Sequence, residues 1–412
     1  MNMHVAQAAE FEISMPKSHR GSKTVRGFIC IVLCTAVIMS LSSCWSRREL
    51  NTLAIVLATA LDVGDKPDTV KVTAQIVKPG GIKAGTSSSG GGASEKAYSN
   101  VAYTDKSILS ALSGFTHITN RRMYFSHNEI LIFSSELAQR GISEGIDTFT
   151  RNFETRMNVY ILVSKDKAAD ILDEEIELEQ MPASHISELL QNQELSSETA
   201  IVTLRDFNIA MLSGTMAPIV PMIEMYEFKG KKKAKLEGTA VFKGSRMLGQ
   251  LSVAQTRGLL WITDKAKRHT ITVETKWGKV DLLLTGPKGS IKPFEDEDGS
   301  IGIKLKLSAE GCLEGNETEQ DMSSLENIKM LSELAEEAIR ADIESALKQA
   351  QALSADVFGF GEAIRRDYPK AFEKIKDNWE VEFVKLKPEL EVEVQIDCTG
   401  GIGKPVTQGG GK

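Results

Sequence analysis

Cysteine and histidine are the side chains in this 412-residue chain with the clearest potential for chemistry. Five cysteines are present, together with six histidines: His4, His19, His117, His127, His185 and His269. No two histidines have the H-E-x-x-H spacing of a zinc site, and the sequence contains no C-x-x-C pair. We therefore expect no metal and no cofactor, and we interpret His127 as a hydrogen-bonded structural residue.

Three short patterns resemble parts of enzyme signatures but lack their partners. Residues 127–129 give the H-x-E of a zinc deaminase without a P-C-x-x-C. Residues 164–167 give S-x-x-K without an S-D-N or K-T-G. The glycines of 359–361 follow a predicted long helix, whereas a dinucleotide fingerprint must follow a strand. These fragments predict that the chain is not an enzyme.

Cys44 stands at the end of a segment typical of an export signal. A basic cluster ends at Arg26, and residues 27–41 (GFICIVLCTAVIMSL) then run for 15 residues without a charge. That length is short for crossing a bilayer, which needs roughly 20 apolar residues, but it suits the apolar core of a signal peptide. The final tetrapeptide, Leu-Ser-Ser-Cys, resembles the cleavage site of bacterial lipoproteins.

The lipoprotein resemblance implies that Cys44 is lipidated and becomes the first residue after cleavage. It would then be an N-palmitoyl, S-diacylglycerol cysteine, and residues 1–43 would be the signal peptide. An N-terminal anchor helix with an incidental cysteine is the alternative. Because Glu10 and Glu12 are unusual ahead of a signal, we expect Met15 to be the true start.

The net charge of the mature chain limits the classes of partner that it can bind. With 49 basic and 56 acidic residues, the whole chain carries −7. Removing residues 1–43 takes away four basic and two acidic residues, which leaves −9. An acidic balance argues against nucleic-acid binding and against general electrostatic adhesion to anionic lipid, so membrane attachment would depend on the lipid carried by Cys44.

Cys312 and Cys398 remain in the mature chain, and either a disulfide or two free thiols fits an exported chain.

Strand-like and helix-like segments alternate along the chain and predict an α+β or α/β fold. We expect three consecutive mixed sheet-and-helix domains. Their ranges are an N-terminal α/β domain at 44–200, a smaller sheet-rich middle domain at 201–290, and a C-terminal α/β domain at 291–403. The last contains a long helix that starts after Ser323 or Ser324, and residues 404–412 are expected to be a disordered tail. The basic run at 229–235 (KGKKKAK) is expected to be a solvated hairpin end, with lipid headgroups as the lesser alternative.

A set of motifs resembles one known family over almost all of 41–400. Cys44, Trp45 and residues 47–51, followed by the apolar LAIV, resemble the start of mature spore germination lipoproteins of the Ger(x)C family. Further matching positions are 122–127, 136–138, 147–151, Arg156, 218–221, 238–243, Gly249, Leu251, 356–361 and Trp379. The chain departs from the family at Ser46, where aspartate is usual, and at Ser135, where glycine is usual.

This resemblance implies the C subunit of a nutrient germinant receptor. Such a subunit is non-enzymatic, has three α/β-type domains, and acts in receptor assembly and signalling with membrane-embedded A and B subunits. It would be held by lipid on the outer face of the spore inner membrane, while nutrient recognition is generally placed in the B subunit. A lipid-anchored solute-binding protein of a transporter, with two lobes and a ligand cleft, is the alternative.

Overall fold

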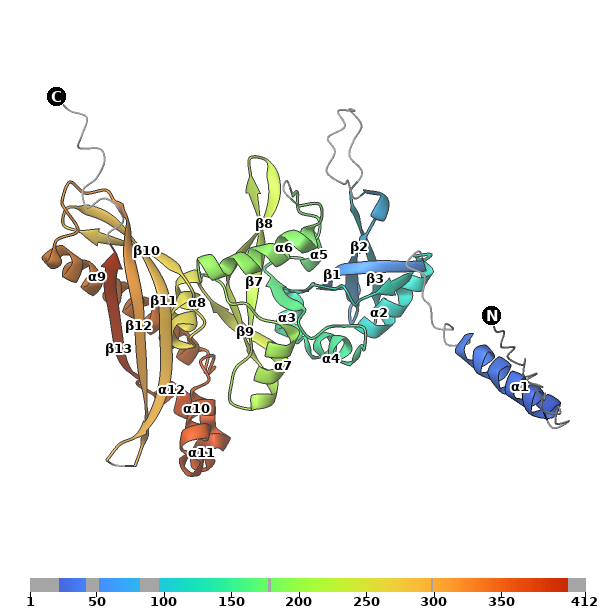
Figure 1. Cartoon of the computed structure of the whole chain (residues 1–412). Helices are drawn as coiled ribbons and strands as arrows, with labels where there is room; N and C mark the ends of the chain where they lie inside the picture. Colours follow the sequence, from blue (N-terminus) through green and yellow to red (C-terminus); the bar gives the residue numbers. More distant parts are fainter. Residues whose placement is uncertain (1–21, 42–51, 82–95, 177–178, 298, 399–412) are drawn as a thin grey trace, which may run out of the picture. The chain divides into compact units, whose positions relative to one another are not determined.

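A computed structural model of the chain describes residues 22–41, 52–81, 96–176, 179–297 and 299–398 (Figure 1). The chain divides into two compact units, one ending at Leu53 and one starting at Ala54. The first unit contains helix α1 (Ser22–Leu41). None of the helices within these described ranges is long and apolar enough to cross a membrane.

Nine strands of the described chain form the first sheet. In spatial order, eight of them run β3-β2-β1-β5-β6-β7-β8-β9, and β4 pairs separately with β1. The central strands β1, β5, β6 and β7 are parallel, and antiparallel strands extend both edges. Their bounds are β1 (Leu53–Val63), β2 (Val70–Val77), β3 (Tyr98–Asp105), β4 (Arg122–Tyr124), β5 (Ile130–Ser134), β6 (Tyr160–Ser164), β7 (Ile219–Phe228), β8 (Lys231–Lys243) and β9 (Arg246–Leu251).

Both faces of this sheet are buried, which explains why β5 is apolar at nearly every position. Ile130 and Ile132 point into one hydrophobic cluster, and Leu131 and Phe133 point into the other. The first cluster includes side chains of α5 and α6, and the second includes side chains of α2, α3 and α4. These helices are α2 (Ile108–Gly114), α3 (Ser135–Arg140), α4 (Ser143–Arg151), α5 (Ala168–Ile171) and α6 (Pro182–Gln191).

The second sheet has the order β10-β11-β12-β13, in which β13 runs parallel to β12 and the other pairs are antiparallel. Its strands are β10 (His269–Thr275), β11 (Gly278–Glu295), β12 (Ile301–Asn316) and β13 (Glu389–Cys398). Helices α7 (Leu204–Ser213) and α8 (Val253–Ile262) precede it in the chain, and α9 (Leu325–Ala352), α10 (Phe360–Asp367), α11 (Pro369–Ile375) and α12 (Trp379–Lys385) lie between β12 and β13 in sequence.

Helix α9 packs along the second sheet through one apolar stripe. Ser324 caps its start by accepting a hydrogen bond from the backbone N–H of Asn327, as the sequence predicted. The stripe consists of Leu331, Ala335, Ile339, Ile343, Ala346, Leu347 and Ala350. Two polar side chains of α9 also reach the backbone of edge strand β13. Arg340 donates to the Leu390 carbonyl, and the Glu336 carboxylate accepts from the Val394 N–H. This occupies backbone groups that an exposed edge would leave unpaired.

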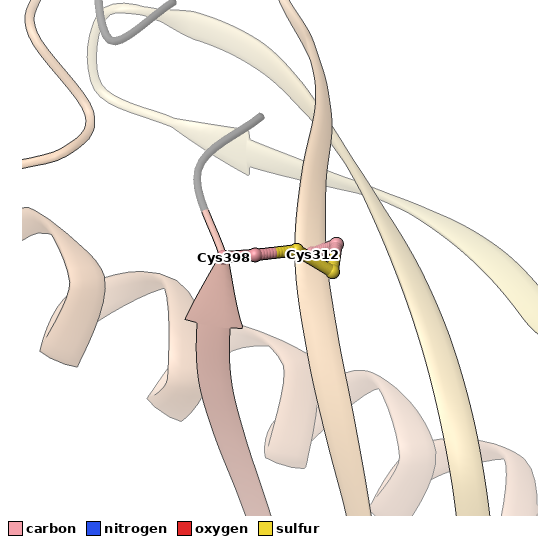
Figure 2. The surroundings of a disulfide bond; sticks show 2 residues. All are labelled: Cys312 and Cys398. Atoms are coloured by element: carbon pink, nitrogen blue, oxygen red, sulfur yellow. A yellow bond between two sulfur atoms is a disulfide. The ribbon is translucent and has the colours of Figure 1, made fainter. Parts of the chain in front are cut away.

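A disulfide between Cys312 and Cys398 closes the C-terminal end of β13 onto β12 (Figure 2). The two residues are register partners on these parallel strands, with Cα atoms 4.7 Å apart. The bond joins positions 86 residues apart in sequence. The structure therefore resolves the choice between a bridge and two free thiols in favour of the bridge.

The described chain contains two sheets, whereas we expected three sheet-based units. Residues 201–290, expected to form a middle domain, divide between the two: β7, β8 and β9 extend the first sheet, and β10 and most of β11 belong to the second. Hydrophobic periodicity locates strands along a chain, but it does not say which sheet a strand joins. Strand β11 also continues to Glu295, beyond the expected end of the middle domain at residue 290. The domain boundaries stay a prediction.

Candidate functional site

The predicted lipidation residue, Cys44, lies outside the described residues, as does the tetrapeptide that ends in it. Strand β1 starts at Leu53, nine residues further along the chain. The two upstream cysteines, Cys30 and Cys34, are exposed on α1. The family-like motifs from residue 122 onward, in contrast, lie within the described residues.

Asp356 organises the motif at residues 356–361. Its side chain is buried, with 3% of its surface exposed. Oδ1 accepts backbone N–H bonds from Phe358, Gly359 and Phe360, and Oδ2 accepts one from Gly361 at 2.8 Å. Burial raises the pKa of this carboxyl from 3.8 to about 6, although the four N–H bonds favour the charged form. The carboxylate thus holds the start of α10 in place.

Steric constraints explain why residues 359 and 361 of the motif are glycine. Gly359 has φ +81°, a left-handed conformation that glycine adopts without strain. A Cβ at Gly361 would collide with the side chains of Thr215 and Trp379. The same corner is tied to residues 215–217, since the Ala217 N–H donates to the Asp356 carbonyl at 2.8 Å. The motif is therefore a structural corner joining α10 to the segment that leads into β7.

One other family-like glycine meets this region from the first sheet. A Cβ at Gly249 of β9 would approach Leu353, just after α9, to 2.9 Å. Gly238 of β8 has φ +70°, and a Cβ there would collide with the Leu251 carbonyl of β9, so this glycine permits close pairing within the first sheet. Gly249 and the 356–361 motif thus supply close contacts where the first sheet meets the C-terminal part.

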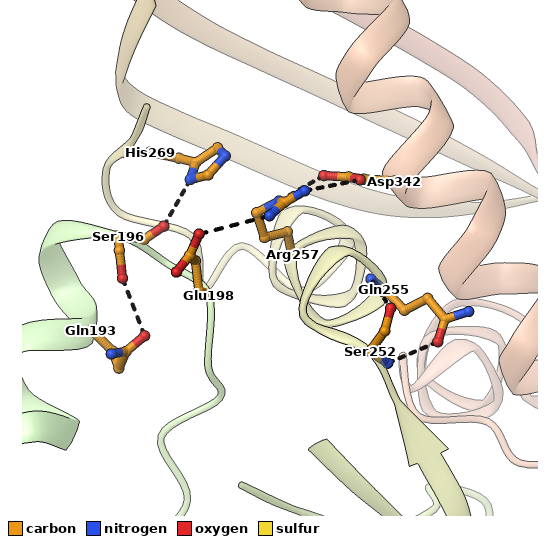
Figure 3. A network of polar contacts seen from close by, with 8 residues as sticks. All are labelled: Gln193, Ser196, Glu198, Ser252, Gln255, Arg257, His269 and Asp342. Carbon is orange, nitrogen blue, oxygen red and sulfur yellow. Dashed lines mark hydrogen bonds and ion pairs between the residues drawn. The ribbon is translucent and has the colours of Figure 1, made fainter. Parts of the chain in front are cut away.

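A polar network crosses between α8, α9 and the segment before α7 (Figure 3). Arg257 of α8 donates to both carboxylate oxygens of Asp342 on α9, at 2.8 and 3.3 Å. Glu198 lies 3.8 Å from the same guanidinium. The helices approach closely here because residue 258 is glycine, and a Cβ would collide with the Asp342 carbonyl. This bidentate ion pair fixes the register of α8 against α9.

The loop at 196–198 carries the rest of the network. His269 of β10 donates from Nδ1 to the Ser196 carbonyl at 2.9 Å (Figure 3). Ser197, buried and at φ +52°, accepts backbone N–H bonds from Lys267 and Arg268. Burial lowers the pKa of His269, so the imidazole is neutral at pH 7. His269 thus has a structural role in this network.

A cleft of about 820 Å³ lies between α7, α8, α10 and β11. Its lining is largely apolar and includes Phe207, Ile209, Leu259, Ile291, Phe358 and Ala363. The charged groups at its margin are largely engaged with one another or with backbone: Arg365 pairs with Glu362, and Asp264 accepts from the Gly289 N–H. The cleft holds no side-chain pair at the spacing of a nucleophile and its base.

The enzyme-like fragments have structural roles. The Ser164 hydroxyl donates to the Lys167 carbonyl at 3.4 Å, in the turn before α5. The His127 ring contacts the Tyr124 ring, with centroids 6.0 Å apart. Across the described ranges, no three histidine, cysteine, aspartate or glutamate side chains gather closely enough to hold a metal ion. Residues 400–404 lie outside those ranges.

Several structurally important charges were missed by our reading of the sequence. Arg257 is the one charge in an otherwise uncharged helix, which was an available signal, whereas Asp342 is one of many charges along α9 and gave none. Glu174 gave no signal: its buried carboxylate accepts from the Ala234 N–H at 3.0 Å and contacts His185 Nδ1 at 2.8 Å. The hydrogen bond between Glu174 and His185 is the main reason why the pKa of His185 is raised.

Two family matches follow one another along the chain. Residues 46–225 match the family described as Spore germination protein N-terminal domain. Residues 237–400 match the family described as Spore germination B3/GerAC like, C-terminal. Between them they cover most of the chain, and the first begins two residues after Cys44.

Relatives from Bacillus subtilis (strain 168) match over nearly their full lengths. Spore germination protein KC is 26% identical over 405 residues, covering 93% of this chain and 98% of the relative. Spore germination protein B3 is 20% identical over 375 residues, covering 89% and 97%. The fold is similar to a solved structure titled Crystal Structure of the GerBC protein, with a TM-score of 0.52 at 18% identity over 83% of this chain and 98% of that one.

Proposed function

The chain belongs to the GerAC/GerKC family of spore germination proteins, the C subunits of germinant receptors, and from that premise we propose that it is a lipid-anchored C subunit of a nutrient germinant receptor. In this proposal it acts non-enzymatically, in receptor assembly and signalling, on the outer face of the spore inner membrane. Its partners are the membrane-embedded A and B subunits.

The single observation that carries the proposal is the placement of the family match relative to Cys44. The match begins at residue 46, immediately after the predicted cleavage site. The tetrapeptide that resembles a lipoprotein cleavage site therefore lies directly ahead of the family match. Two acyl chains on Cys44 would hold the body stably at a bilayer, whereas one chain holds only weakly.

The non-enzymatic role is supported by what the matching motifs do in the fold. Asp356, Gly361 and Gly249 support backbone turns and close packing at a junction. Arg257 and Asp342 satisfy each other in an ion pair. These groups serve packing, backbone hydrogen bonding and ion pairing within the fold, which gives each of them a structural explanation.

The anchor is tested by Cys44→Ala, with Cys34→Ala as the matched control. Both variants lose one cysteine, but Cys34 lies within the predicted signal peptide. We expect Cys44→Ala to abolish the diacylglyceryl mass on the mature N-terminal peptide and to impair nutrient-triggered germination in a strain without paralogues. Cys34→Ala should behave as wild type. Normal germination with unlipidated protein would overturn the proposal.

The partnership is tested by co-purification from spore inner membrane. A tag after residue 398 should recover the A and B subunits with the wild-type chain in mild detergent. For the alternative, a solute-binding protein, the 820 Å³ cleft is the place for a ligand. Tight binding of a small nutrient by calorimetry, without A and B subunits in the purified complex, would favour that alternative.

A further inference from the structure

The hairpin formed by β7 and β8 ends in a basic and aromatic tip, defined here as residues 226–233 (YEFKGKKK). Lys229 and Gly230, with φ +52° and +76°, form a two-residue turn between the paired residues Phe228 and Lys231. Two successive positive φ angles are those of a type I′ turn, which matches the twist of the flanking strands. The tip is therefore a regular, rigid structure.

The tip extends beyond the rest of the first sheet (Figure 1). Strand β6 pairs with β7 only at Met222 and Ile223, so the last five residues of β7 pair with β8 alone. Aromatic side chains remain exposed there, with 48% of Phe228 and 38% of Tyr226 accessible to solvent. Large apolar groups in a projecting hairpin contribute little to the core.

Pairing places the aromatic residues and two lysines on one face. Phe228 lies opposite Lys231, and Tyr226 lies opposite Lys233. The Nζ atoms of Lys229 and Lys233 lie 5.2 and 5.7 Å from the centre of the Phe228 ring. The tip holds four lysines against one glutamate, a formal charge of +3 on a chain of net −7.

The outer edge of β8 is held by the protein itself. The Glu175 N–H donates to the Lys232 carbonyl at 2.9 Å, and the Ala234 N–H donates to the buried Glu174 carboxylate at 3.0 Å. These bonds occupy backbone groups at the edge of the hairpin and leave the side chains of Phe228 and Tyr226 exposed. The arrangement combines a fixed orientation with an exposed contact surface.

We propose that this tip docks on an anionic phospholipid surface, with Phe228 and Tyr226 at the headgroup level and the lysines on lipid phosphates. Lysines near an anionic bilayer and aromatic rings at the interface are each favoured there. A convex projecting tip fits a flat bilayer, whereas an acidic peptide would need a groove. The inference rests on the proposed function in one respect: an N-terminal anchor holds the tip near a membrane.

Docking at both the anchor and the tip would fix how the first sheet lies on the bilayer. Leu61 of β1 is level with Met222 of β7 across the parallel strands. Seven residues separate Ala54 from Leu61 and six separate Met222 from Phe228, so the two ends lie roughly 40 Å apart at about 3.3 Å per residue. The ten residues from Cys44 to Ala54 reach at most about 36 Å. Strands standing fully upright would place Ala54 beyond that reach, so the strands would tilt away from the membrane normal.

The test places a fluorescent reporter at the tip of the full-length chain. Phe228 is replaced by an environment-sensitive fluorescent amino acid, and the protein is reconstituted through its own N-terminal anchor into vesicles. One set contains only phosphatidylcholine, and the other contains 30% phosphatidylglycerol as a chosen condition of about physiological anionic content. Leu325, 85% exposed at the start of α9, carries the same reporter as a position control.

We expect a blue shift and quenching by bromolipids at position 228 in the anionic vesicles at low salt, and neither effect in neutral vesicles or at position 325. Each lysine contributes about fivefold to partitioning, so the set Lys229→Gln, Lys231→Gln, Lys232→Gln and Lys233→Gln should weaken docking by several hundredfold. The matched control removes four exposed lysines elsewhere: Lys348, Lys370, Lys374 and Lys387.

Identical spectra at position 228 in the two vesicle types would overturn the inference. So would an unchanged anionic response after loss of the four tip lysines, or a response to an acidic peptide or an oligonucleotide in place of vesicles. The N-terminal mass is measured on the same samples. If a chain without lipid on Cys44 still docks, the inference about the tip is supported and the lipid anchor is refuted. If a lipidated chain does not dock, the lipid anchor is supported and the inference about the tip is refuted.

Discussion

Replacing Asp356 by asparagine separates the two opposing effects that act on this carboxyl group. Burial disfavours its charge, and four backbone N–H bonds favour it. Because the folded pKa of about 6 lies above the ordinary 3.8, the group's contribution to stability is full below pH 3.8 and is lost as pH rises through 6. The difference between the two pKa values corresponds to about 3 kcal/mol.

Asparagine keeps the shape but cannot ionise. Its amide oxygen can accept the bonds from residues 358–360, while its NH₂ group would face the Gly361 N–H, which now lies 2.8 Å from Oδ2. The lost bond should cost about 1–3 kcal/mol at pH 4. At pH 7 the wild type has lost about 3 kcal/mol through ionisation, so Asp356→Asn should be equally stable or more stable.

Urea denaturation of both proteins at pH 4, 5.5, 7 and 8 (our choice, to bracket the pKa of about 6) measures this crossing. Asp367→Asn is the control, because Asp367 is ionised at the surface beside Arg366. Other groups that titrate cancel in the difference between variant and wild type. The reasoning is refuted if the difference in unfolding free energy between the wild type and Asp356→Asn stays constant above pH 4. It is also refuted if that difference grows in favour of the wild type.

Three further variants test the junction and the bridge. Asp342→Ala leaves the α8 guanidinium without its bidentate partner and should lower the free energy of unfolding by about 1–3 kcal/mol in urea denaturation, with Asp342→Asn losing less. Gly361→Ala should lower it by about 2–4 kcal/mol, whereas Gly80→Ala, where the added methyl has open space, should change it little. Replacing Cys312 and Cys398 together by serine should cost about 2–4 kcal/mol and lower the Tm, and an unchanged Tm in oxidising buffer would argue against a bridge in solution.

Local structure followed from the sequence where a single pattern decided it. Helix α9 starts at Ser324, one of the two serines that we expected to cap it, because capping acts over a few residues. The partition of strands between sheets could not be predicted in the same way. Strands β9 and β10 both lie within the expected middle domain, yet they join different sheets, since the choice depends on contacts distant in sequence.

The junction was beyond prediction for the same reason. Asp356 and Gly361 belong to the 356–361 motif of the family resemblance, but the sequence did not indicate which residues they contact. Their partners Thr215 and Trp379 lie far away in sequence and became visible only in the fold. The disulfide was left open because a strand register decides it, and β12 and β13 are separated by four helices.

These locations determine how a germination defect should be interpreted. A substitution at Asp356 or Gly361 disturbs a buried corner, so the amount of folded protein in the membrane falls before any contact with a partner is changed. A substitution at Lys229 or Phe228 changes an exposed hairpin tip and should leave folding intact. Loss of germination at normal protein abundance can therefore identify a functional surface only for exposed positions such as Lys229 and Phe228. For buried positions such as Asp356 and Gly361, germination must be compared at equal amounts of folded protein, and a defect that disappears under that comparison is one of stability.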